Sequence, residues 1–369
     1  MHVTWLDLAD FRSYRRLTWR PDPGINVLVG PNGAGKTTVL EAIGYLSALR
    51  SFRGTPDAAL IRTGSASAVA RGGFATEAGE TTIEVELPGS GRRRVLVNGK
   101  RPMRLSTVAV TAPVVAFLPD DLDLVKESAG VRRRYLDDLG SQLSPGYGAT
   151  VSEYESVLRQ RNALLRRDGP LTDDLALEVW DARLVETATL LWAERAELTS
   201  RLKPFLTAAH HAVSGGYDRL GAALRPAWGV DGEELAMLVF DPDEAAARLS
   251  AALGARRRRE LEQRTTTVGP HRDDVTLTLD ERDLRTQASQ GEQRLAAVAL
   301  RVAAYYILAD RHGHPPVLLL DDVFSELDLS RTAAVVEMLP RGQVLVTTTR
   351  EDEVPVEGRR WEVSEGTVR

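Results

Sequence analysis

The segment from Gly30 to Thr37 constrains this 369-residue chain more than any other. Its sequence, Gly30-Pro31-Asn32-Gly33-Ala34-Gly35-Lys36-Thr37, fits the pattern of a phosphate-binding loop. A buried strand is expected before it, over Ile25 to Val29, and a helix after it, over Thr37 to Leu49. Glycines let backbone amides surround a phosphate, and the helix N-terminus favours negative charge. We therefore predict a nucleotide site in which Lys36 reaches the terminal phosphates and the Thr37 hydroxyl ligates magnesium.

A second element predicts the other half of such a site. The apolar run from Val317 to Leu320 indicates a buried strand, and two carboxylates, Asp321 and Asp322, end it. Adjacent like charges are costly without a cation, so a magnesium ion beside the phosphate loop explains them better than a solvated turn. We assign Asp321 to magnesium, through water, and Asp322 to orienting the attacking water in phosphoryl transfer. With Lys36 they form the expected catalytic group.

A third segment, Ser289-Gln290-Gly291-Glu292, stands before a helix expected over Glu292 to Ala309. A helix start that carries a hydroxyl is a ready anion site, and it could face ATP held by a second molecule. The alternative is an ordinary helix with Ser289 as its N-cap. Because this segment follows a phosphate loop and precedes an acidic strand, we favour the ATP-facing interpretation.

The order of elements predicts an α/β fold with a largely parallel sheet and an inserted, mostly helical lobe. Strand patterns dominate the first third and return at 275–279, 317–320, 343–347 and 361–363. Between them, 121–264 shows long helical patterns broken by Pro and Gly. The expected domains are therefore 1–120 with 265–369, and 121–264. The breaks lie at Ser144-Pro145-Gly146, Asp168-Gly169-Pro170, Ser214-Gly215-Gly216 and Asp241-Pro242.

Composition excludes several classes of protein. The chain has no cysteine, which rules out disulfides, thiolate metal sites and cysteine nucleophiles. No apolar run is long enough to cross a bilayer and no secretion signal begins the chain, so we expect a cytoplasmic protein without membrane partners. The net charge of -5 gives no overall attraction to nucleic acid.

Basic side chains are nevertheless clustered. Each cluster is either a solvated face or a phosphate contact. We rank the two clusters in the inserted lobe as DNA candidates above the third, because a lobe inserted beside the nucleotide-binding core can wrap a duplex. The lobe clusters are Arg132, Arg133 and Arg134, and Arg256, Arg257, Arg258 and Arg259; the third is Arg92 to Arg94 with Lys100, Arg101 and Arg104.

These motifs, in this order, resemble those of ABC-type P-loop ATPase heads, and among them the RecF family of bacterial DNA replication and repair proteins. The resemblance covers most of the chain and is strongest at Gly269-Pro270-His271-Arg272-Asp273-Asp274 and at 319–328. It includes Asp10-Phe11-Arg12-Ser13-Tyr14, Leu40-Glu41-Ala42-Ile43, Arg50-Ser51-Phe52-Arg53, Pro119-Asp120-Asp121-Leu122 and the run from Arg132 to Asp137. Two positions depart from the family pattern: Asp120 replaces a glutamate, and Thr38, at the end of the nucleotide loop, replaces an asparagine.

The resemblance implies how the chain works. ATP with Mg²⁺ would be bound at the interface of an ATP-dependent homodimer, where Ser289 of one subunit faces the γ-phosphate held by Lys36 of the other. Asp120 and Asp328 would lie at the same interface. The dimer would clamp gapped or junction DNA and assist recombinase loading with the RecO and RecR proteins, and slow, DNA-dependent hydrolysis would reset it.

Three rivals are less consistent with the sequence. An SMC-type head needs a very long coiled coil, which the broken helices of 121–264 cannot form. The ATPase subunit of a membrane transporter would lack an arginine-rich lobe. A small-molecule kinase needs no second serine that faces ATP. For His271, the absence of a nucleophile pattern favours a structural hydrogen-bonding role between sheet and lobe.

Overall fold

A computed structural model gives the fold, and it describes residues 1–216, 218–228, 241–323, 342–350, 354, 357–364 and 366–369. The chain divides into two compact units. The first comprises 1–121, 208–217 and 294–369, and the second comprises 122–207 and 218–293. This division differs from the predicted domains mainly at 265–293, which belong to the second unit.

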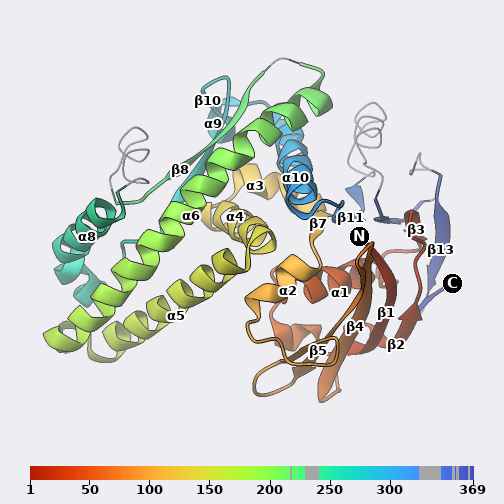
Figure 1. The fold of residues 1–369 in the computed structure, drawn as a ribbon, viewed down its shortest axis with the longest axis horizontal. Coiled ribbons are helices and arrows are strands. Elements are labelled where there is room, and N and C mark those ends of the chain that lie inside the picture. Colours follow the sequence, from red (N-terminus) through yellow and green to blue (C-terminus); the bar gives the residue numbers. More distant parts are fainter. Residues whose placement is uncertain (217, 229–240, 324–341, 351–353, 355–356, 365) are drawn as a thin grey trace. The chain divides into compact units, whose positions relative to one another are not determined.

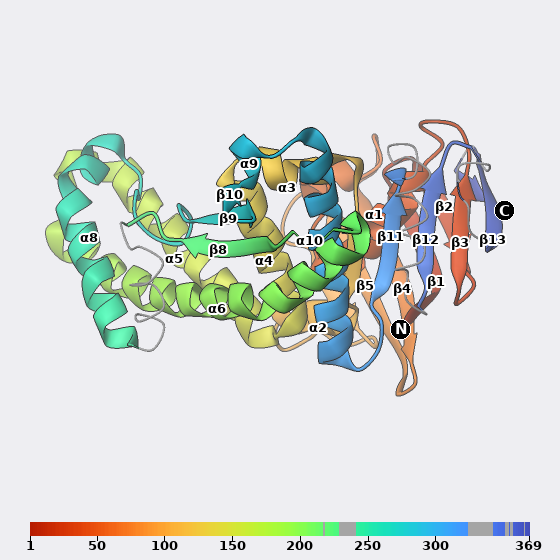
Figure 2. The same cartoon turned by 90° about the horizontal axis from the view of Figure 1, so that it is seen from above.

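The first unit contains the predicted parallel sheet (Figure 2). Its strand order is β14-β13-β3-β12-β11-β7, and every neighbouring pair is parallel except β13 with β14. All residues of β11 and β12 are buried, as expected for a sheet covered on both faces. The strands are β3 (Ile25–Val29), β7 (Val114–Phe117), β11 (Val317–Asp321), β12 (Val344–Thr348), β13 (Arg359–Ser364) and β14 (Thr367–Val368).

An antiparallel sheet of order β2-β1-β4-β5-β6 completes this unit (Figure 1). Its strands are β1 (His2–Phe11), β2 (Tyr14–Trp19), β4 (Ser67–Thr76), β5 (Gly79–Pro88) and β6 (Arg94–Val97). Helix α1 (Lys36–Ala48) contacts both sheets and is buried along most of its length, which makes it the centre of the core. After β6, Asn98 and Gly99 have φ of 50° and 74°, and Val97 and Lys100 exchange hydrogen bonds across this predicted turn.

The second unit is mostly helical. It contains α3 (Asp123–Lys126), α4 (Ala129–Leu143), α5 (Pro145–Asp168), α8 (Pro242–Gln263) and α9 (Leu284–Gln287). Helices α6 (Asp174–Ser214) and α10 (Gln290–His312) begin in it and continue into the first unit, which also holds α2 (Ser106–Thr111). The four predicted breaks are confirmed as helix ends or starts. In the part of the chain described, no helix is long and apolar enough to span a membrane.

A small antiparallel sheet also belongs to the second unit, with the order β10-β9-β8. We expected β9 (Asp274–Leu279) in the parallel sheet, but it pairs with β8 (Leu220–Arg225) and β10 (Arg282–Asp283). Its burial alternates residue by residue, the pattern of an antiparallel strand with one solvated face. The sequence did not predict β8, because one glycine and two alanines in six residues give weak strand propensity.

Candidate nucleotide-binding site

The predicted phosphate loop lies between β3 and α1. Its backbone needs glycine at Gly33 and Gly35, which have φ of 80° and 106°, where other residues are strained. At Gly35 there is also no room, because an added Cβ would lie 2.8 Å from the hydroxyl oxygen of Tyr14. That hydroxyl donates to the Gly35 carbonyl at 3.2 Å. The loop therefore turns tightly into the N-terminus of α1, where the helix favours an anion.

Lys36 lies inside this loop rather than on its surface. The side-chain amine donates to the carbonyl oxygens of Gly30 and Pro31, at 2.7 and 3.0 Å, and the residue is 7% exposed. Burial lowers the pKa of Lys36, and the neighbouring carboxylates of Asp322 and Asp321 oppose that shift. The amine is thus positioned between the loop and the acidic strand.

The acidic strand meets the phosphate loop through two hydroxyl groups. Thr37 donates to Asp321 Oδ1 at 2.8 Å, and Thr347, at the end of the neighbouring strand β12, donates to the same oxygen at 2.7 Å. Thr347 also accepts from the backbone N–H of Asp322 at 3.0 Å, and Asp322 has a φ of 52°. The sequence did not identify Thr347 as a site residue. The signal was its place at the end of a parallel strand, where side chains of neighbouring strands gather.

The chemistry of these oxygens fits a magnesium ion. The Thr37 hydroxyl and the Asp321 carboxylate are hard oxygen ligands 2.8 Å apart, and Mg²⁺ in phosphate sites takes one or two such ligands together with phosphate oxygens and water. Within the described residues no group of three or more His, Cys, Asp or Glu is arranged to hold a metal without such help.

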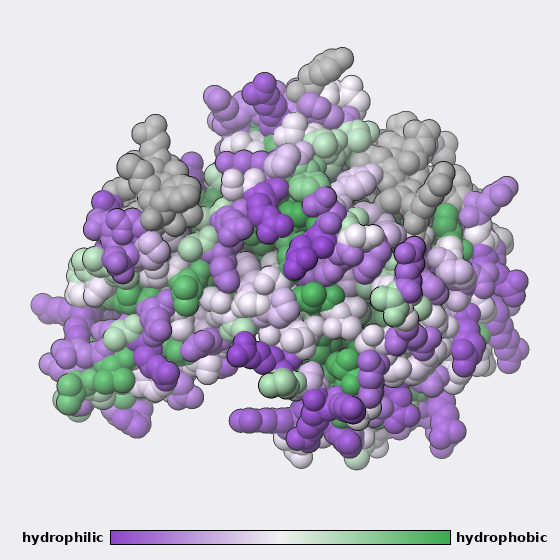
Figure 3. All heavy atoms as spheres, viewed as in Figure 1, coloured by the Kyte–Doolittle hydropathy of each residue, from purple (hydrophilic) through white to green (hydrophobic). Residues whose placement is uncertain are grey.

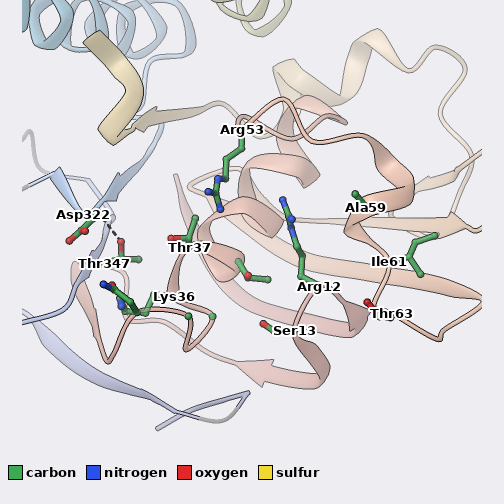
Figure 4. A pocket seen from close by; sticks show the side chains of 14 residues that line it. Arg12, Ser13, Lys36, Thr37, Arg53, Ala59, Ile61, Thr63, Asp322 and Thr347 are labelled. Atoms are coloured by element: carbon green, nitrogen blue, oxygen red, sulfur yellow. Dashed lines mark hydrogen bonds between the residues drawn. The ribbon is translucent and has the colours of Figure 1, made fainter. Parts of the chain in front are cut away.

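A cavity of about 520 Å³ opens beside the loop (Figure 4). Arginine side chains of Arg12 and Arg53 reach into it from outside the phosphate loop, and Figure 4 shows them pointing toward the same region above Thr37. Predicted residues in the lining are Asn32, Gly33, Gly35, Lys36, Thr37, Thr38 and Asp322; the others are Arg12, Ser13, Arg53, Ala59, Ile61, Thr63 and Thr347.

The predicted partner-facing segment is a capping box at the start of α10. Glu292 donates its backbone N–H to Ser289 Oγ at 3.3 Å, and Ser289 donates its own N–H to the Glu292 carboxylate at 2.6 Å. Hydrogen bonds of its carboxyl group with the side chain and the backbone of Ser289 lower the pKa of Glu292. Ser289 and Gln290 remain exposed, and Gly291 is partly exposed, so the cap leaves the segment accessible.

Two other residues, Asp120 and Asp328, are expected at the interface between subunits. Asp120 is exposed in the short 3-10 helix Pro119–Leu122, whereas its neighbour Asp121 accepts from Arg301 at 2.6 Å. Asp328 lies outside the described residues.

The prediction that Arg132 contacts DNA is wrong for this structure. Arg132 is 5% exposed, binds Asp274 through two hydrogen bonds of 2.8 and 2.9 Å, and donates to the Glu127 carbonyl. A guanidinium so occupied cannot also neutralise a phosphate. Arg133 is half-buried and donates to the Asp273 carbonyl, and only Arg134 is exposed.

The remaining basic clusters differ in how many of their charges are paired. On α8, Arg257 binds Asp174 at 2.7 Å and Arg258 binds Glu262 at 3.1 Å, while Arg256 and Arg259 are exposed. Around β6, Arg93 is bound by Asp57 and the Leu49 carbonyl. Five exposed basic residues there make no ion pair with any described residue: Arg92, Arg94, Lys100, Arg101 and Arg104, hereafter the β6 cluster.

Comparison with known families shows to which family the chain belongs. The family model for the RecF/RecN/SMC N-terminal domain matches residues 2–364. The DNA replication and repair protein RecF of Renibacterium salmoninarum is 40% identical over 99% of this chain and 98% of its own length. This chain belongs to the RecF family. RecF of Streptomyces avermitilis is also 40% identical, over 100% of this chain and 99% of its own length.

Solved structures agree with that membership. The recombination mediator protein RecF-ATPrS of the RecFOR pathway matches with a TM-score of 0.90 and 28% identity, over 100% of this chain and 97% of that one. A Smc head domain from Pyrococcus furiosus, at 17% identity, has a TM-score of 0.53 over 100% of this chain and 95% of its own, which supports the fold alone. The predicted fold, an ABC-type ATPase head with a helical lobe, is confirmed.

Proposed function

We propose that this RecF-family protein is an ATP-driven DNA clamp of replication and recombinational repair. The observation that carries the proposal is that Lys36 and Thr37 line one cavity, and that the Thr37 hydroxyl is hydrogen-bonded to Asp321, which together supply a phosphate cation and two magnesium-type oxygens. ATP is the proposed ligand, since a relative of this fold is the recombination mediator protein RecF-ATP. The phosphate loop, Gly30 to Thr38, would hold its phosphates.

Hydrolysis would use the acidic strand. The Thr37 hydroxyl would hold a magnesium ion directly, and Asp321 would hold it through water. The ion would supply charge neutralisation for phosphoryl transfer. Asp322 would orient the attacking water, held in its left-handed backbone conformation by the hydrogen bond from its N–H to Thr347. We expect slow, DNA-dependent hydrolysis that resets the clamp.

Closure would need a second copy. The exposed capping box at Ser289 offers a hydroxyl and the positive end of a 23-residue helix, both suited to a γ-phosphate. In the proposed homodimer, Ser289 of one subunit faces ATP held by Lys36 of the other, with Asp120 and Asp328 at the same interface. The proposed work is recognition of gapped or junction DNA and, with RecO and RecR, assistance in recombinase loading.

The β6 cluster is the proposed DNA contact in place of the lobe arginines. Figure 3 shows mostly hydrophilic side chains over the lower edge of the first unit, where Figure 1 places β5 and the loop toward α2. Five exposed basic residues without ion pairs among the described residues suit phosphates better than clusters in which some arginines are already bound to carboxylates. The observation reverses the ranking expected from the sequence.

Dimer closure is tested by light scattering with and without ATP and gapped DNA. The unmodified protein should dimerise with ATP and retain DNA, and Ser289→Arg should still bind ATP but remain monomeric, because the arginine would occupy the partner's γ-phosphate position. A Ser289→Arg protein that dimerised normally with ATP would show that the two-subunit site is wrong.

DNA contact is tested by alanine substitution of the whole β6 cluster, with Arg256→Ala/Arg259→Ala as the matched control of exposed arginines. In the presence of ATP, each lost phosphate contact should reduce the slope of log DNA affinity against log salt concentration by about 0.9. We expect flattening in the first variant alone. Flattening only in the control would place DNA on α8.

A further inference from the structure

Three sequence motifs that the proposed function leaves unexplained meet at one buried carboxylate. They are the segments around Arg12, Glu41 and Ser51, which lie at the end of β1, inside α1 and in the loop after α1. Glu41 is fully buried, one turn into the helix that begins at Lys36. A buried carboxylate is costly unless it is paired and hydrogen-bonded, so its partners indicate what it holds in place.

Its main partner is Arg12. The guanidinium donates to both carboxylate oxygens of Glu41, through Nε at 2.8 Å and Nη2 at 2.7 Å, in the two-bond geometry that fixes an arginine most firmly. Nη2 also donates to the Thr55 hydroxyl at 2.8 Å, and the Ser51 hydroxyl donates to Glu41 Oε1 at 2.5 Å. The orientation of Arg12 is therefore set by Glu41 and Thr55, and Ser51 in turn fixes the Glu41 carboxylate.

The backbone at Arg12 is shaped for the same purpose. Arg12 has a φ of 55°, which is uncommon for a residue other than glycine and persists only where the surroundings hold it. Here its N–H donates to the Leu60 carbonyl at 2.7 Å, and Phe11 pairs with Ile61. The turn carries the side chain from the sheet to Glu41 and into the lining of the nucleotide cavity (Figure 4).

One donor of Arg12 is left over. Its Nη1 makes no hydrogen bond to any described residue, and the side chain is 25% exposed. Arg53, whose N–H donates to Ser51 Oγ at 3.1 Å, lines the same cavity. We infer that Glu41 is a positioning residue for nucleotide binding: it holds Arg12 so that the free edge of the guanidinium meets the bound polyphosphate. This inference rests on ATP being the ligand of the cavity.

The test compares ATP affinity, by calorimetry on the full chain, for the unmodified protein and Glu41→Gln. The amide keeps the size of the side chain but turns one acceptor into a donor that faces an arginine N–H, which breaks the two-bond pairing. We expect affinity to fall about tenfold, as for loss of one charge-assisted contact. Arg12→Lys, which keeps the charge without the fork, should lose a similar factor.

The double variant Glu41→Gln/Arg12→Lys separates positioning from a general packing role. If Glu41 acts through Arg12, the two losses overlap and the double variant binds ATP about as well as either single variant. Losses that multiply, or unchanged affinity in folded Glu41→Gln, would overturn the inference. Should Glu41→Gln fail to fold, unchanged affinity in Arg12→Lys would overturn it equally.

Two controls complete the design. Tyr45→Phe, one turn further along α1, removes a buried hydroxyl that donates to Asp57 at 2.8 Å without touching Arg12, and it should leave affinity within about twofold. An equal loss of ATP affinity in Tyr45→Phe would overturn the inference, because the loss would then come from disturbing the loop after α1 and not from moving Arg12. Lys36→Ala, measured in parallel, separates the positioning role of Glu41 from the ATP site on which it rests. Unchanged ATP affinity in Lys36→Ala would reject the ATP site itself.

Discussion

Charged side chains are buried in both units of the molecule, but they are used in opposite ways. At the phosphate loop, the Lys36 amine has hydrogen bonds to only two backbone carbonyls among the described residues, and it keeps a donor for a ligand. In the helical unit, Arg195 is fully engaged: it binds both oxygens of Asp137, at 2.9 and 2.7 Å, and the Pro270 carbonyl. The comparison teaches that the partners of a buried charge distinguish a binding site from an internal brace.

The strongest test of this contrast is Arg195→Ala. Its removal leaves Asp137, 8% exposed, with Tyr147 as its main remaining side-chain partner, and breaking a buried pair costs about 3–5 kcal/mol. We expect a loss of that size in the unfolding free energy of the second unit, measured in urea, with ATP affinity unchanged in folded protein. The control is Arg201→Ala on the same helix, whose exposed pair with Glu197 at 3.9 Å is worth less than about 1 kcal/mol. A cost below that of the control would reject the brace.

Lys36→Ala should give the converse result. ATP affinity falls by more than about a hundredfold, or about 3 kcal/mol, because the phosphates lose the only cation of the loop. Stability without nucleotide should not fall, since a buried ammonium is costly to keep. Calorimetric titration with ATP measures the first effect and urea unfolding the second. Lys100→Ala, an exposed lysine in the same unit, should leave ATP binding intact. Micromolar binding retained by Lys36→Ala would contradict the site.

The same contrast explains what the sequence could predict. The phosphate loop and the strand that ends in Asp321 were predicted correctly, because their chemistry is local: glycine conformation, a helix N-terminus and adjacent carboxylates. Thr347 was missed as a site residue because its contact with Asp321 depends on strand order, which no local pattern reveals.

Arginine clusters were the weakest predictions for a related reason. Arg132 and Arg94 occur in similar basic runs, yet one is 5% exposed beside Asp274 and the other is exposed. The carboxylate partner of Arg132 stands 142 positions away in the chain, so only tertiary structure shows that the charge is used internally. For the same reason, β9 could be recognised as a strand but not assigned to its sheet.

The pH dependence of stability tests two buried groups of the second unit, Asp273 and His271. Burial raises the pKa of Asp273 to about 6, against a hydrogen bond from the Ala227 N–H, and burial lowers the pKa of His271 to about 4, against its bond to the Thr266 carbonyl. Between about pH 4 and 6 folded Asp273 binds more protons than the unfolded chain, so its contribution to stability falls as pH rises. Folded His271 binds fewer, so its contribution rises over the same window.

Asp273→Asn removes only the contribution of Asp273 to stability, which falls as pH rises. Relative to the unmodified protein, its unfolding free energy should therefore increase from pH 4 to pH 6, by about 2 kcal/mol. Urea unfolding at intervals across that range measures the difference between the two proteins, which cancels all other titrating groups. A flat difference would mean that Asp273 is not protonated in the folded state at pH 5. His271 itself, bonded to Tyr154 at 2.6 Å, links α5 to the segment before β9, in keeping with a structural role.

The smallest effect on stability is expected at Ser289, whose hydroxyl both caps a helix and is the proposed contact with the partner's ATP. The hydroxyl caps α10, so Ser289→Ala should cost about 1 kcal/mol of stability. Glu292→Ala is the matched control, because it removes the other half of the same capping box and leaves the hydroxyl in place. If the hydroxyl also meets the partner's ATP, light scattering with ATP should show weaker dimerisation in Ser289→Ala than in Glu292→Ala at similar cost in stability. Equal dimerisation in the two variants would reduce Ser289 to a helix cap, a brace like those of the second unit.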